Sequence, residues 1–297
     1  MKKVLSVVLA LAMTGVLFAG CASTPAAPSS EAPASSEAPA SSEAPASSEA
    51  ASAGLTGKVA LSGSTSMQEL MEAFIEAYKT AEPGVTVECQ YPGSGPGITA
   101  VTDGTVDIGN ASRELKPEEA EKLDAHIVAI DGIAVALNPA NKAQDLTIDQ
   151  LAKIYTGEVK NWKEVGGDDK AIVVIGRDAA SGTREAFETL VNVKEKCKYA
   201  QELTSTGAVK TAVASNPDAI GYVSLNSVDD TIRAAKVEGV EATEANILAG
   251  TYKLNRPFVM ATNKSKTLSE TAQAFLDYAM GAQGQEIVKG MGLIVKQ

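Results

Sequence analysis

The sequence predicts an α/β fold built on mainly parallel sheets. Short apolar segments of strand character alternate with segments whose apolar residues recur at helical spacing. Glycine-containing segments lie between the predicted strands and the helices that follow them. With 297 residues, of which 44% are hydrophobic, the chain can bury a substantial core in one or two domains.

The predicted strands are short runs of mostly apolar residues bounded by turn residues. They are Lys58–Leu61, Val85–Tyr91, Val106–Ile108, Ile127–Leu137, Ala171–Ile175, Ala219–Val223 and Pro257–Ala261. The first predicted helix is Met67–Tyr78, and Ser66 with Glu69 forms the signature of a capping box at its start. Further helices are predicted at Pro117–Leu123, Ile148–Tyr155, Thr183–Val191, Ala208–Ser215, Thr243–Leu248 and Leu268–Met280.

The beginning of the chain has the features of an export signal. Two lysines precede an apolar run from Val4 to Phe18, which is shorter than the ~20 residues of a membrane span, so residues 1–20 are predicted to be a signal peptide. The segment Leu17–Cys21 resembles a bacterial lipobox. It predicts cleavage before Cys21 and attachment of a lipid such as palmitate to that residue. An ordinary secretory signal with a chance cysteine is the alternative.

Residues 21–54 are predicted to be a disordered tether. The unit Ser-Ser-Glu-Ala-Pro-Ala recurs at 29–34, 35–40 and 41–46, and it has no aromatic or branched apolar side chain to bury. A lipid anchor, a tether and a globular body in this order describe a protein held at the extracytoplasmic face of the cell membrane.

Charge and cysteine content exclude several kinds of partner. The net charge is -11 and no basic run follows Lys3, whereas nucleic acid is bound by clustered Lys and Arg. A small anion can still bind where a few donors converge. Cys89 and Cys197 could form a disulfide, although two free thiols are favoured. With one histidine and no CxxC motif, neither a metal nor a cofactor is expected.

Three segments between strands and helices could surround one small anion. They offer hydroxyl groups and the free N–H groups of helix starts, which suit a tetrahedral oxyanion at the carboxyl ends of strands. The segments are Gly63–Met67, Gly93–Gly97 and Arg177–Arg184. Each has a purely structural alternative, namely a helix cap, a tight turn, and a cap beside an Arg177–Asp178 ion pair.

Asp107 lies in the predicted strand Val106–Ile108. A carboxylate at a buried strand end needs a partner, which could be a turn, an arginine, or the proton of an oxyanion. Phosphate near neutral pH carries a proton and sulfate does not, so an acceptor here could favour phosphate by ~10⁴–10⁵. The sequence leaves open whether Asn110 and Ser112 bind the anion or only support Asp107.

These segments together resemble the phosphate-binding proteins of phosphate ABC importers. The resemblance covers residues 55–297, and its most specific pieces are Thr156–Trp162 and the Arg177 loop with Ser181-Gly182-Thr183. The other matching segments are the lipobox, Gly63-Ser64-Thr65, Gly93-Ser94-Gly95, Asp107-Ile108-Gly109 and Gly221-Tyr222.

The resemblance implies a two-lobe periplasmic-binding-protein fold, type II-like, with mixed sheets flanked by helices and two crossover strands. Lobe I would comprise residues 55–133 with 255–297, and lobe II residues 134–254. A monomer would enclose phosphate between its lobes and deliver it to ABC permease subunits in the membrane. The implied phosphate-binding residues are Thr65, Ser66, Ser94 and the acceptor Asp107 from one lobe, and Arg177, Ser181, Gly182 and Thr183 from the other.

Other functions remain open at this point. Related binding proteins take sulfate, molybdate or tungstate. A phosphoester hydrolase would need a general base, and the only histidine, His126, heads an apolar strand run, so no catalytic residue is predicted and the protein is expected not to be an enzyme. A scaffolding lipoprotein would fit the tether but would leave Arg177 beside Ser181-Gly182-Thr183 unexplained.

Overall fold

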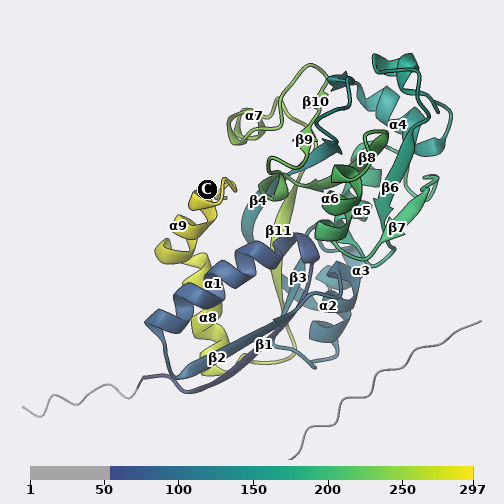
Figure 1. Ribbon diagram of the computed structural model, residues 1–297. Helices are drawn as coiled ribbons and strands as arrows, with labels where there is room; N and C mark the ends of the chain where they lie inside the picture. Colours follow the sequence, from purple (N-terminus) through teal and green to yellow (C-terminus); the bar gives the residue numbers. More distant parts are fainter. Residues whose placement is uncertain (1–53, 297) are drawn as a thin grey trace, which may run out of the picture. The chain divides into compact units, whose positions relative to one another are not determined.

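A curled mixed sheet with helices on both faces runs through residues 54–296, which are the residues that the computed structural model describes (Figure 1). Its strands are β1 Gly57–Gly63, β2 Val85–Gln90, β3 Ile108–Ala111, β4 Leu123–Leu137, β6 Val173–Arg177, β7 Gln201–Leu203, β8 Ala219–Ser224, β9 Arg233–Ala234 and β11 Asn255–Asn263. The short strands β5 Asp145–Leu146 and β10 Lys236–Val237 pair separately. The helices are α1 Gln68–Ala81, α2 Ser94–Thr102, α3 Pro117–Ala120, α4 Ile148–Thr156, α5 Gly182–Leu190, α6 Thr206–Ala214, α7 Glu244–Leu248, α8 Glu270–Met280 and α9 Ala282–Gly290.

The strand order is β2-β1-β3-β11-β4-β8-β6-β7, with β9 paired to β4. Pairing is parallel between β1 and its neighbours β2 and β3, and between β6 and its neighbours β7 and β8. Strand β11 pairs antiparallel with β3 and β4, and β4 pairs antiparallel with β8, which makes the sheet mixed. The prediction of an α/β fold is therefore confirmed, whereas the expectation of mainly parallel pairing is wrong because β4 and β11 pair antiparallel with their neighbours.

The two central strands divide the described residues into two sides with separate cores. Strand β4 pairs with β11 as far as Gly132 and with β8 from Ile133 onward. We call the elements from β1 to α3, with α8 and α9, the first side, and the elements from β5 to α7 the second side. Phe74 and Phe275 lie in the core of the first side, and Trp162 lies in that of the second. The lobe boundaries given above stay a prediction.

A buried ion pair joins β4 to β11 near this change of partner. Nη2 of Arg256 lies 2.8 Å from a carboxylate oxygen of Asp131, and Ser224 of β8 donates to the other oxygen at 2.7 Å. Arg256 is 3% exposed and Asp131 is 1% exposed. Burial raises the pKa of Asp131, and the charge of Arg256 opposes this. The pair therefore ties together the two strands that connect the sides.

Helix α2 forms where the sequence predicts only a glycine-rich loop at Gly93–Gly97. Pro96 stands in its first turn, where a missing N–H breaks no helical hydrogen bond. Gly97 lies so close to β1 that a Cβ there would collide with the backbone of Ser62 and Gly63. The glycines, which lower helix propensity, thus permit close packing of the helix on the sheet.

The two cysteines of the body are free, as favoured from the sequence, and both are half-buried. Burial raises the pKa of Cys89 and of Cys197 to about 11, so that little thiolate forms at neutral pH. None of the helices within residues 54–296 is long and apolar enough to cross a bilayer. The predicted signal peptide, Cys21 and the repeats of the tether lie outside the described residues.

Candidate functional site

Hydroxyl side chains from both sides of the molecule meet in one buried cluster. Each member is at most 9% exposed, and hydrogen bonds connect all of them. We call these seven residues the hydroxyl cluster: Ser64, Thr65, Ser66, Ser94 and Ser112 from the first side, and Thr183 and Thr206 from the second.

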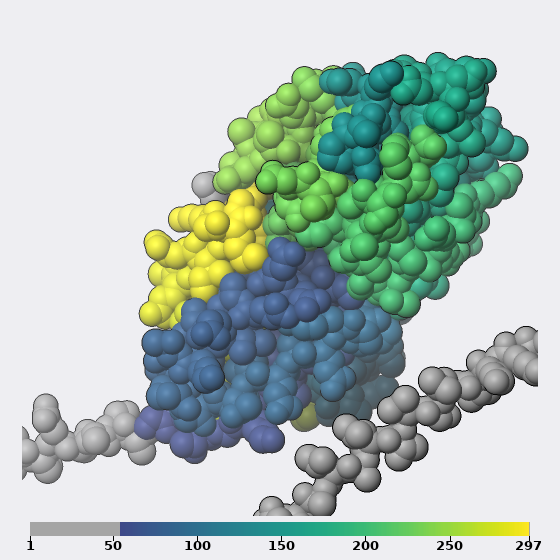
Figure 2. All heavy atoms as spheres, in the orientation of Figure 1, coloured from purple at the N-terminus to yellow at the C-terminus, as the bar shows by residue number. Residues whose placement is uncertain are grey.

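Short hydrogen bonds within the cluster cross from one side to the other. Ser66 Oγ lies 2.7 Å from Thr183 Oγ1 and 3.0 Å from Thr206 Oγ1. Thr65 Oγ1 lies 3.1 Å from Thr206 Oγ1 and accepts from the Thr206 backbone N–H at 3.2 Å. Figure 2 shows the start of α1 against the segment around α6. The two sides are therefore in contact at the cluster.

Ser112 is the most connected member of the cluster. Its Oγ lies 2.8 Å from Ser64 Oγ, 3.3 Å from Ser94 Oγ and 3.4 Å from Thr183 Oγ1. It follows β3 directly, so it stands at the carboxyl end of that strand next to the carboxyl end of β1. The sequence left the role of Ser112 open, and the structure places it within the site.

Four helices begin at the cluster. The 3₁₀ turn Thr65–Met67 leads into α1, and α2, α5 and α6 each have a cluster member in their first turn. The first N–H groups of a helix have no partner inside it, and the helix dipole places partial positive charge at the same end. Four such ends around one set of hydroxyls make a region that favours an anion.

Arg177, at the end of β6, brings a full positive charge to the cluster. It is 2% exposed, and its Nη1 donates to Thr206 Oγ1 at 3.3 Å. Its other nitrogens donate to the carbonyls of Leu203 and Thr204, and no carboxylate of the described chain pairs with it, its neighbour Asp178 included. Burial lowers the pKa of Arg177. A desolvated cation with only neutral partners favours an anion beside it.

The residues between Arg177 and Thr183 shape this part of the site. Ser181 caps α5, where its Oγ accepts from the backbone N–H of Arg184 at 3.2 Å. At Gly182 a Cβ would collide with the side chain of Ser94 and lie 3.1 Å from Ser112 Oγ. Only glycine therefore lets the start of α5 approach the first side so closely.

The chain matches a known protein family over most of its length. Residues 41–283 match the family model described as the PBP superfamily domain. The chain belongs to the PBP superfamily. Among its relatives in that superfamily, the phosphate-binding protein PstS of Bacillus subtilis is 35% identical over 243 residues, which are 78% of this chain and 78% of the relative.

Solved structures of PBP superfamily relatives agree with the fold. A protein from Clostridium perfringens, described as a phosphate ABC transporter substrate-binding protein and solved with bound phosphate, is 42% identical. It matches with a TM-score of 0.79 over 81% of this chain and 100% of its own. An ABC-type phosphate transport receptor from Vibrio cholerae is 33% identical, with a TM-score of 0.68 over 81% and 100%. The resemblance and the fold class inferred from the sequence are confirmed.

The structure corrects the predicted position of Asp107. One carboxylate oxygen of Asp107 accepts from the backbone N–H of Ala60 at 2.9 Å. The residue precedes β3, so it stands at the amino end of the strand, whereas Ser112 stands at the carboxyl end with the cluster. The strand begins two residues later than predicted, at Ile108, and this places Asp107 outside the site. The expected pairing of Asp107 with Arg177 across one anion is therefore wrong.

The other predicted residues lie at or beside the cluster. Four are members of it, Arg177 contacts it, Gly182 packs against it and Ser181 caps the helix that leads from it. Sequence reasoning missed Thr206. Its signal was Ser205-Thr206-Gly207 at the start of α6, which repeats the pattern of hydroxyl and glycine at the start of α5.

None of the seven members of the cluster is a carboxylate or an imidazole, the groups that most often act as general acids or bases. The cluster's side chains are all hydroxyls, with Arg177 beside them. His126, on β4, instead lies 3.0 Å from Thr262 Oγ1 on β11. Within residues 54–296 no group of three or more His, Cys, Asp or Glu residues is arranged to hold a metal ion.

Proposed function

We propose that this protein binds inorganic phosphate outside the cytoplasm and delivers it to an ABC-type phosphate permease. The observation that carries the proposal is Arg177, a buried guanidinium beside seven buried hydroxyls and without a carboxylate partner among the described residues. The relatives support it, since the Bacillus subtilis protein is named for phosphate binding and the Clostridium perfringens protein was solved with phosphate.

The site would hold phosphate by converging donors from both sides. Hydrogen bonds to a charged group each contribute about 1.5–3 kcal/mol, so several of them can offset desolvation and leave micromolar or tighter affinity. Because the cluster draws members from both sides, an anion within it would favour the arrangement in which the sides meet. We infer that the two predicted lobes open to admit phosphate and close around it.

The proposal extends to the attachment of the chain to the membrane and to its protein partners. We propose that residues 1–20 are removed as a signal peptide and that lipidated Cys21 anchors the chain to the extracytoplasmic face of the membrane. Residues 21–54 would then give the monomeric binding protein reach toward the permease subunits. The relatives named above are described as a phosphate-binding protein, a substrate-binding protein of an ABC transporter and a phosphate transport receptor, which supports a role as a binder rather than an enzyme.

Calorimetry tests the proposed function. The purified protein, freed of bound phosphate by unfolding and refolding, is expected to bind one phosphate per chain with micromolar or lower Kd. Sulfate, titrated in parallel, is expected to bind more weakly, as it should if the chain shares the ligand for which its relatives are named. Equal binding of the two anions, or no binding of either, would contradict the proposal.

Gly182→Ala is expected to lower phosphate affinity by about tenfold or more. The added Cβ would push Ser94 and Ser112 from their present positions, and each misplaced hydrogen bond to a charged ligand costs about 1.5–3 kcal/mol. Gly207→Ala is the matched control, since Gly207 stands in the first turn of α6 and a Cβ there meets nothing within 4 Å. Calorimetry measures the phosphate affinity of both variants. An equal loss of affinity in the two would contradict the role given to Gly182.

A further inference from the structure

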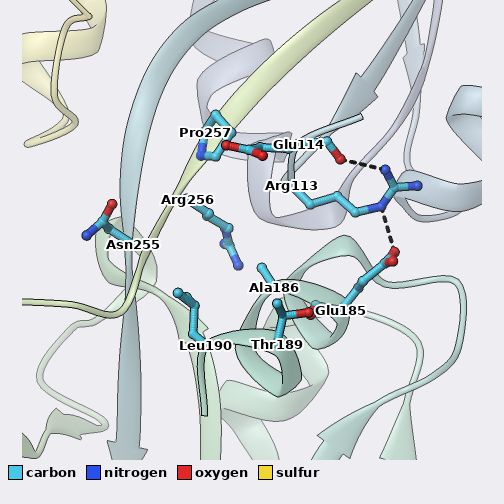
Figure 3. A pocket seen from close by; sticks show the side chains of 9 residues that line it. All are labelled: Arg113, Glu114, Glu185, Ala186, Thr189, Leu190, Asn255, Arg256 and Pro257. Carbon is cyan, nitrogen blue, oxygen red and sulfur yellow. Dashed lines mark hydrogen bonds and ion pairs between the residues drawn. The ribbon is translucent and has the colours of Figure 1, made fainter. Parts of the chain in front are cut away.

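An ion pair crosses between the two sides directly beside the hydroxyl cluster. Nε of Arg113 lies 2.8 Å from a carboxylate oxygen of Glu185 (Figure 3). Arg113 follows Ser112 in the chain, and Glu185 lies in the first turn of α5, two residues after Thr183. Neither charged residue makes a hydrogen bond to the cluster, but each is fixed to a segment that supplies one of its members.

Arg113 is held in place by its own side of the molecule. Its Nη1 and Nη2 donate to the two carboxylate oxygens of Glu119 at 2.7 and 2.8 Å, and Nη1 also donates to the Glu114 carbonyl at 2.8 Å. Bidentate pairing of this kind fixes the plane of a guanidinium. Since the side chain is only 6% exposed, Arg113 presents its remaining donor, Nε, to Glu185 in a fixed direction.

Glu185 brings a matching negative charge from the second side. Besides Arg113, its carboxylate lies 3.4 Å from Nζ of Lys116 on the first side and 3.3 Å from Nζ of Lys194. Its side chain is 24% exposed, and it borders a cavity of about 310 Å³ that Arg256 and Leu190 also line (Figure 3). Water therefore reaches one side of the pair, which weakens it relative to a fully buried one.

We propose that the Arg113–Glu185 pair holds the two halves of the oxyanion site together and thereby slows release of the bound anion. This inference rests on the proposed function. Moving α5 away from β3 would break the pair as well as the contact between Ser112 and Thr183. Arg113 and Glu185 are thus positioning residues. They add to the free energy of the closed arrangement without touching the ligand.

Glu185→Gln tests the proposal with little risk to the fold, because Arg113 keeps both bonds to Glu119. Dissociation of radiolabelled phosphate from the full chain is expected to be about tenfold faster, while the association rate stays unchanged. This value lies between the near-zero effect of an exposed pair and the larger effect of a buried one. Higher salt is expected to speed dissociation from the wild type and to change it less in the variant.

Glu202→Gln is the matched control. Arg184 is held by Glu188 at 2.8 Å and by Glu202 at 2.9 Å, so this variant also removes one of two carboxylates from a partly buried arginine. All three residues belong to the second side, and the variant is therefore expected to release phosphate at the wild-type rate. A merely structural effect of losing a carboxylate would appear equally in both variants.

The outcomes separate the two proposals. If the wild type binds phosphate and Glu185→Gln releases it at the wild-type rate, or no faster than Glu202→Gln, the role of the ion pair is overturned and the proposed function stands. If the wild type binds no phosphate, the proposed function itself fails. Faster release from Glu185→Gln alone, with its reduced salt dependence, supports the pair as the element that holds the site closed.

Discussion

Replacing Arg177 with methionine is expected to lower phosphate affinity by about 10²- to 10⁴-fold, because removing one partner of a buried charge pair costs about 3–5 kcal/mol. In the variant the anion would still meet hydroxyl groups and helix ends, but no full positive charge beside them. The affinity is expected to fall because the site is buried, and a desolvated anion without a counter-charge is costly. Calorimetric titration of the variant with phosphate measures the loss.

The control for Arg177→Met is its stability without phosphate. Arg177 is buried and has only neutral partners, so the ligand-free variant is expected to unfold near the wild-type temperature. Phosphate at 100 times its Kd should stabilise the wild type by about 2.7 kcal/mol and the variant hardly at all at that concentration. A variant that keeps the ligand-dependent shift would show that the anion binds elsewhere.

Arg256→Met is expected to destabilise the fold by about 3–5 kcal/mol at neutral pH, the usual consequence of removing one partner of a buried ion pair. Asp131, which is 1% exposed, would keep only Ser224 as a side-chain partner. Denaturant unfolding of wild type and variant at pH 7.5 measures the difference. An effect below 1 kcal/mol would mean that β4 and β11 do not depend on this pair.

The pH dependence of the Arg256→Met loss gives a second test. Burial raises the pKa of Asp131, and removing the opposing charge of Arg256 raises it further. A carboxyl whose pKa is higher in the folded state binds a proton on folding, so the destabilisation should shrink as pH falls through that raised pKa. The double variant Arg256→Met with Asp131→Asn leaves no buried charge at this position, and it should recover most of the stability at neutral pH.

The main features of the fold are predictable from local patterns in the sequence. Alternating strands and helices indicate the α/β class, and β4 is predicted in outline because its apolar run is long. Helix α2 is not predictable in this way. Its glycines and Pro96 read as a loop, and only the sheet beneath explains why small residues are needed there. The separate helix α9 and the short strands also depend on neighbours that are distant in sequence.

The site is predictable where it follows from strand ends and helix starts. The segments around Thr65 and Ser94 follow the parallel strands β1 and β2, and the segment around Thr183 follows β6, which runs in the opposite direction. The carboxyl ends of the strands of the two sides therefore point toward each other and meet at the cluster. Asp107 was misplaced because β3 begins two residues later than predicted. Asp107 therefore precedes the amino end of the strand and does not lie near its carboxyl end. Ser112 lies at the correct end of that strand. The exact bounds of β3, which the local sequence pattern does not fix, therefore determine which of the two residues lies at the site.

The linked hydroxyls of the cluster have a further chemical consequence. A serine or threonine can turn its O–H bond while the oxygen stays in place, so the same hydroxyl can change from hydrogen-bond donor to acceptor. Between pH 6 and 8 inorganic phosphate interconverts between its singly and doubly charged species. A cage of such rotors with a fixed arginine beside it can accommodate either species by reorienting hydrogens alone, with no rearrangement of the polypeptide.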